Sequence, residues 1–96
     1  MSVDIGSLIV ISPGMKHGRP RIAGTGITVH RIALWYKLGY SPEEMVRKYP
    51  HLTLAQVHAA LAYYHANQAE IDAGIAADEA EYERLEREYV TTRQPA

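Results

Sequence analysis

The glycine-rich segment at residues 18–32, GRPRIAGTGITVHRI, is the stretch whose residue types look most suited to chemistry. Gly24 and Gly26 flank a threonine, and such glycines can bring backbone N–H groups close to a phosphate. A dinucleotide fingerprint needs a third glycine where Val29 stands, and a P-loop needs Gly-Lys-Ser or Gly-Lys-Thr at the start of its helix. Neither pattern is complete. We therefore interpret residues 24–26 as a tight turn and expect no nucleotide or other cofactor.

The chain has five histidines and no cysteine, which limits the metal sites it could form. His58 and His65 are separated by about 10 Å of helical rise if both lie on one helix, too far apart for a single ion. His51 precedes that helix, and no glutamate completes a metalloprotease pattern. Surface or capping histidines are the better interpretation, and no metal is expected.

The carboxylates do not form a recognisable catalytic pair. Six of them crowd into residues 78–88, where they surround a predicted solvated helix. No serine or threonine has an identifiable base and orienting partner in its sequence context. We therefore expect that this protein is not an enzyme.

Charge divides the 96 residues into two parts of opposite sign. Residues 1–65 carry seven basic and three acidic side chains, a net charge of +4. Residues 66–96 carry three basic and eight acidic side chains, a net charge of −5. The basic part suits a polyanion and the acidic part suits a basic protein, although a solvated helix beside an ordinary domain gives the same asymmetry.

The N-terminus MSVDIGSLIVIS has an apolar run of only residues 8–11, with no positive charge before it. This is neither a signal peptide nor a membrane span, so no membrane is expected as a partner. The absence of cysteine fits a reducing compartment, and we expect a cytoplasmic protein. Because so short a chain buries little of its surface, a partner or a dimer is also expected.

Residues 8–11 predict a short buried strand, since the run ends at Ser-Pro-Gly. Its partner would be residues 21–22, residues 27–29 or the same strand of a second chain. A helix is predicted to begin near Thr28 or Val29 and to end at Leu38, because Gly39 can take the left-handed conformation after it. The side chains expected to face inward are Val29, Ile32, Ala33, Tyr36 and Trp35.

Two capping boxes mark the starts of the next helices. Ser41 with Glu44 opens a short helix that has proline at its first position, and Pro50 ends that helix near Tyr49. Thr53 with Gln56 opens the third helix. The chain thus reads as helix, turn, helix after a first helix, which is the spacing of a three-helix DNA-binding fold.

The third helix carries a heptad pattern that extends far along the chain. Glycine inside a helix costs about 1 kcal/mol relative to alanine, so Gly74 is a possible hinge. We predict one helix through about Asp72 and a second stretch to about Tyr89. The positions of the pattern are Leu54, Val57, Leu61, Tyr64, Gln68, Ile71, Ile75, Asp78, Tyr82, Leu85 and Tyr89.

A DNA-binding head would use basic side chains for phosphates and the start of the third helix for bases. Base contacts are expected from Gln56 and His58, of which only Gln56 suits bidentate recognition of adenine. The candidate phosphate contacts are Arg19, Arg21, Arg31, Lys37, Arg47 and Lys48. Alternatively, Arg19 and Arg21 only fasten the glycine turn to the C-terminal end of a neighbouring helix.

Several motifs, in order over about residues 8–72, resemble the domain-of-unknown-function 433 family. They are GRPRI, GT, ITV, GYSPEE, YPHLT and VHAALAYY. The resemblance implies a homeodomain-like helix-turn-helix core and, for at least some members, an antitoxin whose toxin is a PIN-like ribonuclease. The chain departs from the family at Gly26, where the family commonly has an arginine. If that arginine contacts DNA or a partner, Arg19 and Arg21 would have to supply the contact in this chain.

The fold expected is therefore mainly α: a three-helix, homeodomain-like helix-turn-helix head over residues 1–65, with a short N-terminal β element, and an acidic helical tail over residues 66–96. We expect a dimeric antitoxin of a bacterial type II pair that also binds its operator DNA as an autorepressor. The tail residues expected to contact the toxin are Ile71, Ile75, Tyr82, Leu85 and Tyr89. The alternative is a non-enzymatic module that forms a homodimeric coiled coil and binds no DNA.

Overall fold

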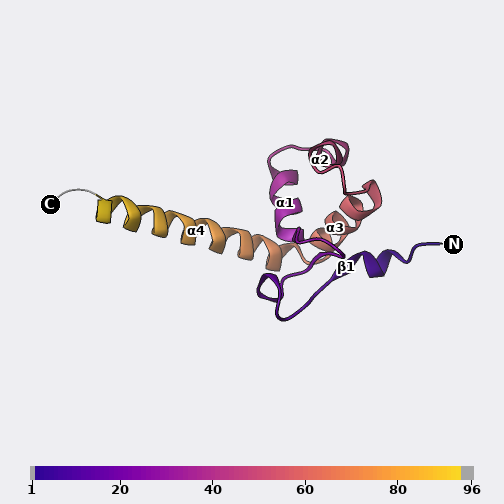
Figure 1. The fold of residues 1–96 in the computed structure, drawn as a ribbon, viewed down its shortest axis with the longest axis horizontal. Helices are drawn as coiled ribbons and strands as arrows, with labels where there is room; N and C mark the ends of the chain where they lie inside the picture. Colours follow the sequence, from indigo (N-terminus) through magenta and orange to yellow (C-terminus); the bar gives the residue numbers. More distant parts are fainter. Residues whose placement is uncertain (1, 94–96) are drawn as a thin grey trace.

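The computed structural model describes residues 2–93, and the side chains of residues 2–90. The chain is mainly α, with a short N-terminal β element and a long C-terminal helix that projects away from the rest (Figure 1). In chain order the elements are η1 (Ile5–Leu8), β1 (Ile9–Val10), η2 (Lys16–Gly18), β2 (Arg21–Ile22), α1 (Val29–Lys37), α2 (Pro42–Lys48), α3 (Leu54–Ala66) and α4 (Gln68–Arg93), where η marks a 3-10 helix. The predicted fold class is confirmed at this level.

The β element is an antiparallel pair in which Ile9 lies opposite Ile22 and Val10 opposite Arg21. Of the three partners considered for the first strand, residues 21–22 are the one used. The strand is shorter than the predicted residues 8–11, because Leu8 ends η1 and Ile11 is 56% exposed.

Helix α1 begins where expected, since the Thr28 side chain accepts a hydrogen bond from the Arg31 N–H. It ends before Gly39, which has a φ of +99°. The expectation that Tyr36 faces inward is wrong, because its side chain is 43% exposed and rests edge-on against Tyr64 at the rim of the core.

Both predicted capping boxes are present. The Ser41 hydroxyl accepts from the Glu44 N–H, and the Glu44 carboxylate accepts from the Ser41 N–H. Thr53 and Gln56 form the same reciprocal pair at the start of α3. Each capping box provides hydrogen-bond acceptors for two backbone N–H groups that have no acceptor within the helix. These bonds fix the starts of α2 and α3.

The long helix is interrupted at Asn67 and not at Gly74, so the predicted helix through Asp72 with a hinge at the glycine is wrong. Asn67 leaves helical geometry (φ −133°, ψ 36°), and its side-chain amide donates to the Tyr63 carbonyl. Asparagine competes locally for backbone hydrogen bonds, which explains why the break falls there. Beyond it, α4 runs through Gly74 without a break.

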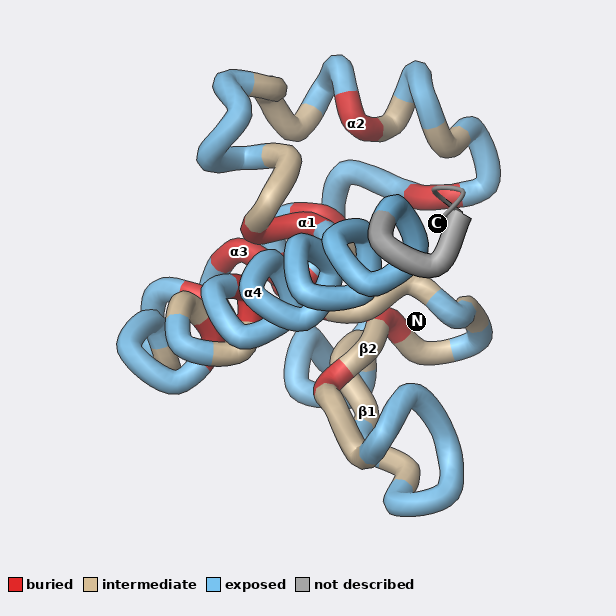
Figure 2. The backbone as a smooth tube through the Cα atoms, turned by 90° about the vertical axis from the view of Figure 1, so that its left-hand side faces the viewer, coloured by how far each residue is buried: buried red, intermediate tan, exposed pale blue. Residues whose placement is uncertain are grey.

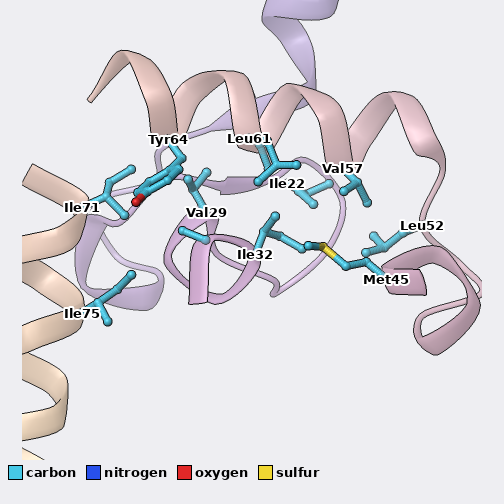
Figure 3. Close-up of a cluster of buried hydrophobic side chains, with 12 residues drawn as sticks. Ile22, Val29, Ile32, Met45, Leu52, Val57, Leu61, Tyr64, Ile71 and Ile75 are labelled. Carbon is cyan, nitrogen blue, oxygen red and sulfur yellow. The ribbon is translucent and has the colours of Figure 1, made fainter. Parts of the chain in front are cut away.

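The core joins the four α-helices, including the first turns of α4 (Figure 3). Ile71 is 1% exposed and Ile75 is 7% exposed, and both belong to the same cluster as the head residues. The buried residues labelled in the close-up are Ile22, Val29, Ile32, Met45, Leu52, Val57, Leu61, Tyr64, Ile71 and Ile75. The boundary expected at residues 65 and 66 thus lies near the helix break, but the core extends past it to Ile75.

Beyond its first turns α4 is exposed on all sides. Every described side chain of residues 76–90 is classed as exposed, and Figure 2 shows most of α4 in pale blue while parts of α1 and α3 are red. Among the described residues, no helix is long and apolar enough to cross a membrane.

Gly74 lies against His30 where α4 packs on α1. A Cβ atom at this position would lie 2.6 Å from Nε2 and 2.9 Å from Cδ2 of His30. His30 is only 8% exposed, and a Cβ atom this close would force its ring or the helix to shift. The glycine therefore serves close helix packing. We refer to the contacts of Ile71, Asp72, Gly74, Ile75 and Asp78 with the head as the α4 seat.

We predict that Gly74→Ala destabilises the protein by about 1–3 kcal/mol, the usual cost of overpacking, although alanine is the better helix former. Urea denaturation of both proteins measures this difference. In a His30→Ala background, where the ring is gone, Gly74→Ala should instead stabilise the protein. A stabilising effect in the wild-type background would contradict the packing role of Gly74.

His30 also predicts a pH dependence. Burial lowers its pKa, and the neighbouring Arg19 lowers it further. Because the ordinary pKa of histidine is about 6.5, the unfolded chain binds a proton that the folded chain resists. The free energy of unfolding should therefore fall as the pH drops below about 6.5. His30→Gln should flatten this fall in denaturation experiments between about pH 7.5 and pH 5.5, whereas His58→Gln, at an exposed position, should leave it unchanged.

Candidate interaction surfaces

Arg19 links the N-terminal region to α4. Its guanidinium donates to both carboxylate oxygens of Asp78, at 2.7 and 3.0 Å, and to the Gly74 carbonyl at 3.5 Å. The Asp78 partner raises the pKa of Arg19, and Arg19 in turn lowers the pKa of Asp78. The interpretation of Arg19 as a fastening residue matches this contact, although the contact lies in the first half of α4 and not at a C-terminal helix end.

Arg21 stabilises the glycine turn through side-chain hydrogen bonds. Its side chain donates to the Thr25 carbonyl at 3.1 Å and to the Ser12 hydroxyl at 3.0 Å. The Thr25 hydroxyl donates to the Ile22 carbonyl and accepts from the Ile27 N–H, while Gly24 takes a φ of +78°. The polar groups of Thr25 thus bond to the residues that flank the turn, as expected of a tight turn.

Two further cations of the predicted phosphate-binding set also have partners within the molecule. Lys37 Nζ lies 2.6 Å from Asp72 Oδ1, an atom that also accepts a hydrogen bond from the Tyr64 hydroxyl at 2.8 Å. These two contacts, led by Lys37, lower the pKa of Asp72. Lys48 Nζ lies over the rings of Trp35 and Tyr40, 4.3 and 5.0 Å from their centroids.

Arg31 and Arg47 remain as exposed cations. Within the described side chains, neither takes part in an ion pair. They lie on α1 and α2, respectively, at positions that other molecules can reach. Of the six candidate phosphate contacts, these two are the ones whose side chains form no ion pair, hydrogen bond or ring contact with the described residues.

The exposed side of α3 is poor in side chains that read bases. Gln56 uses its side-chain oxygen to accept from the Thr53 N–H at 2.8 Å, so it is engaged in the capping box. His58 is exposed, with Ala55 and Ala62 on the same side. The sequence of α3 contains no lysine or arginine.

The predicted partner-binding residues of α4 divide into two groups. Ile71 and Ile75 are buried in the core and support the fold. Tyr82, Leu85 and Tyr89 are 69%, 50% and 57% exposed. Because their spacing is three and four, they lie along one side of the part of α4 that projects from the head (Figure 1). We call these three residues the α4 stripe.

Charges surround the α4 stripe. Arg84 pairs with Glu81 one turn before it and with Glu88 one turn after it, at 2.6 Å from the latter. The Arg84 contact lowers the pKa of Glu81. Side chains in these pairs are 49–60% exposed, so solvent screens the pairs and they add little to stability.

His30 is the important residue that the sequence interpretation missed. It lies beside Gly74, Arg19 and an open groove of about 560 Å³ between α1 and α4. Lys16, Arg31, Trp35 and Glu79 are among the groove residues, so both signs of charge are present. A spacing of 44 positions between a histidine and a glycine gives no local signal, and only the packing of α1 against α4 brings them together.

Among the described residues, no group of side chains could hold a metal ion.

Comparisons with known proteins agree with this fold. The family model described as a protein of unknown function (DUF433) matches residues 9–64 and ends before α4 begins. The crystal structure of a DUF433 member protein from Anabaena variabilis ATCC 29413 is 36% identical, with a TM-score of 0.69, over 73% of this chain and 69% of that one. No curated protein matches the chain. Since the family model covers more than half of the sequence, the chain belongs to the DUF433 family.

Proposed function

We propose that this protein is a non-enzymatic binding module in which the head holds α4 in place and the α4 stripe binds a partner protein. The observation that carries this proposal is the exposure of Tyr82, Leu85 and Tyr89 on a projecting helix. Apolar side chains at this spacing fit the helix-in-groove mode of recognition, where they act as anchors. A partner that packs on these turns would bury the apolar side chains that the head leaves exposed.

The α4 seat makes this arrangement possible. Ile71 and Ile75 bury the first turns of α4, while Asp72 and Asp78 accept from Lys37 and Arg19 of the head. These contacts hold the start of the helix in one orientation. A helix anchored only at its start presents the remaining turns to a partner already formed, which lowers the entropy cost of binding.

The finer form of the proposal is that the partner is a PIN-like ribonuclease toxin and that the protein is a cytoplasmic antitoxin of a type II pair. The family resemblance implies this role for at least some members. The acidic side chains around the α4 stripe support it, because a ribonuclease that binds an anionic substrate presents basic surfaces near its active site.

Operator DNA is the second candidate partner, and the exposed Arg31 and Arg47 favour it. Helices α2 and α3, joined by residues 49–53, have the order of a helix-turn-helix unit. Because α3 has no lysine or arginine and Gln56 is engaged in the capping box, this DNA binding would rest mainly on phosphate contacts.

The partner-binding proposal predicts that Tyr82→Ala with Leu85→Ala abolishes protection in bacteria that co-express the neighbouring open reading frame. Each truncation should weaken binding by about tenfold, as for anchor residues in other interfaces. Growth with the wild-type chain, the double variant and the neighbour alone measures the effect. The matched control is Leu38→Ala on the head, where the side chain is 68% exposed and protection should persist.

A deletion of residues 80–96 should act like the double variant, since it leaves the α4 seat intact. Deletion from residue 66 is the wrong experiment, because it would remove Ile71 and Ile75 from the core. A harmless neighbour would contradict the antitoxin role, and full protection by the double variant would contradict the role of the α4 stripe.

For DNA, Arg31→Ala with Arg47→Ala should reduce the slope of log affinity against log salt by about 1.8, because each lost phosphate contact contributes about 0.9. Titration of operator DNA across salt concentrations gives the slope. Arg84→Ala with Arg87→Ala removes the same charge from α4 and should leave the slope unchanged. Absence of any salt-dependent binding would instead favour an interaction module that binds no DNA.

A further inference from the structure

The α4 stripe has glutamates along both of its borders. In heptad terms Tyr82 and Tyr89 take position a and Leu85 takes position d, the positions that face a partner helix. The flanking e and g positions are all acidic: Glu79 and Glu86 at e, and Glu81 and Glu88 at g. We infer that the α4 stripe selects a partner surface bordered by lysine or arginine side chains and rejects a second copy of α4. This inference rests on the proposed function.

Pairing of two α4 helices would bring like charges together in either orientation. In a parallel pair, g residues face e residues of the other helix, and in an antiparallel pair, e faces e and g faces g. Every one of these contacts within residues 79–89 would join two glutamates. Charges at e and g set the choice of partner in helix pairs, so these glutamates disfavour the homodimeric coiled coil.

The two borders differ in how much charge they offer. Arg84 pairs with Glu81 and Glu88, both on the g border, and offsets part of their charge. Among the described side chains, no ion pair involves Glu79 or Glu86 on the e border. The e border is therefore the more negative one, and it is where basic side chains of the partner should lie.

The α4 stripe also has a defined beginning. Asp78 takes the d position before Tyr82, and it is engaged with Arg19 of the head. The partner therefore contacts two turns, about 11 Å from Tyr82 to Tyr89, and does not need to displace the α4 seat. A short amphipathic segment with apolar anchors and flanking cations has the matching size and charge. A homodimer would have to use a different surface of the molecule.

The test uses the full-length protein and two labelled synthetic helices of about three heptads with leucine at a and d. One peptide carries lysine at e and g, and the other carries glutamate there. Fluorescence anisotropy should show binding of the lysine peptide only. Tyr82→Ala with Leu85→Ala should weaken this binding at least about tenfold, and raising the salt from about 0.05 to about 0.5 M should weaken it too.

Matched charge variants distinguish the effect of the glutamates at the e positions from the effect of the protein's net charge. Glu79→Gln with Glu86→Gln should lower the affinity for the lysine peptide at least about threefold, which is the loss expected when two exposed ion pairs are removed. Glu43→Gln with Glu83→Gln removes the same charge from exposed positions away from the e border and should leave the affinity unchanged. Equal loss in both variants would overturn the inference in favour of unspecific attraction.

Other outcomes separate this inference from the proposed function. Equal binding of both peptides would overturn the charge selection while leaving the α4 stripe as a binding site. Binding of neither peptide would overturn both. Sedimentation equilibrium of the full chain provides the last test: a dimer that dissociates in the Tyr82→Ala, Leu85→Ala variant would show that α4 pairs with itself and would overturn the inference.

Discussion

The close approach of α4 to α1 at Gly74 is the constraint on which the remaining arrangement depends. Only a glycine allows the helix to rest against the buried ring of His30, since any side chain would meet that ring below 3 Å. This approach lets Ile71 and Ile75 enter the core on either side of the glycine, and it places Asp78 beside Arg19. The direction in which α4 leaves the head follows from these few contacts.

The same constraint separates the functional surfaces. Residues of α4 up to Asp78 belong to the head, and residues beyond it are exposed to any partner. Several cations of the candidate phosphate-binding set are instead used to build the fold: Arg19 pairs with Asp78 of α4, Arg21 bonds to the turn and Lys37 pairs with Asp72. The molecule thus pairs a sparse basic surface on α1 and α2 with a dense acidic border on α4.

Local signals in the sequence predicted where the helices start, but they could not predict how distant parts of the chain pack together. The Ser41 and Thr53 capping boxes each depend on residues three positions apart, so both helix starts could be placed from sequence. The break at Asn67 could not, because a heptad pattern continues across it unchanged. Nor could the pattern predict that Ile75 is buried and Tyr82 exposed, since both take position a. Their burial differs because the head contacts α4 at Ile75 and not at Tyr82.

The stiffness of α4 gives the Gly74 contact a mechanical meaning. From Gly74 to Tyr89 the helix extends about 22 Å, so a tilt of about 10° at the contact would displace Tyr89 by about 4 Å. The position of a molecule bound near Tyr89 therefore depends on small changes in packing at Gly74. Helix α4 acts as a lever arm, and the contact between Gly74 and the His30 ring determines its direction.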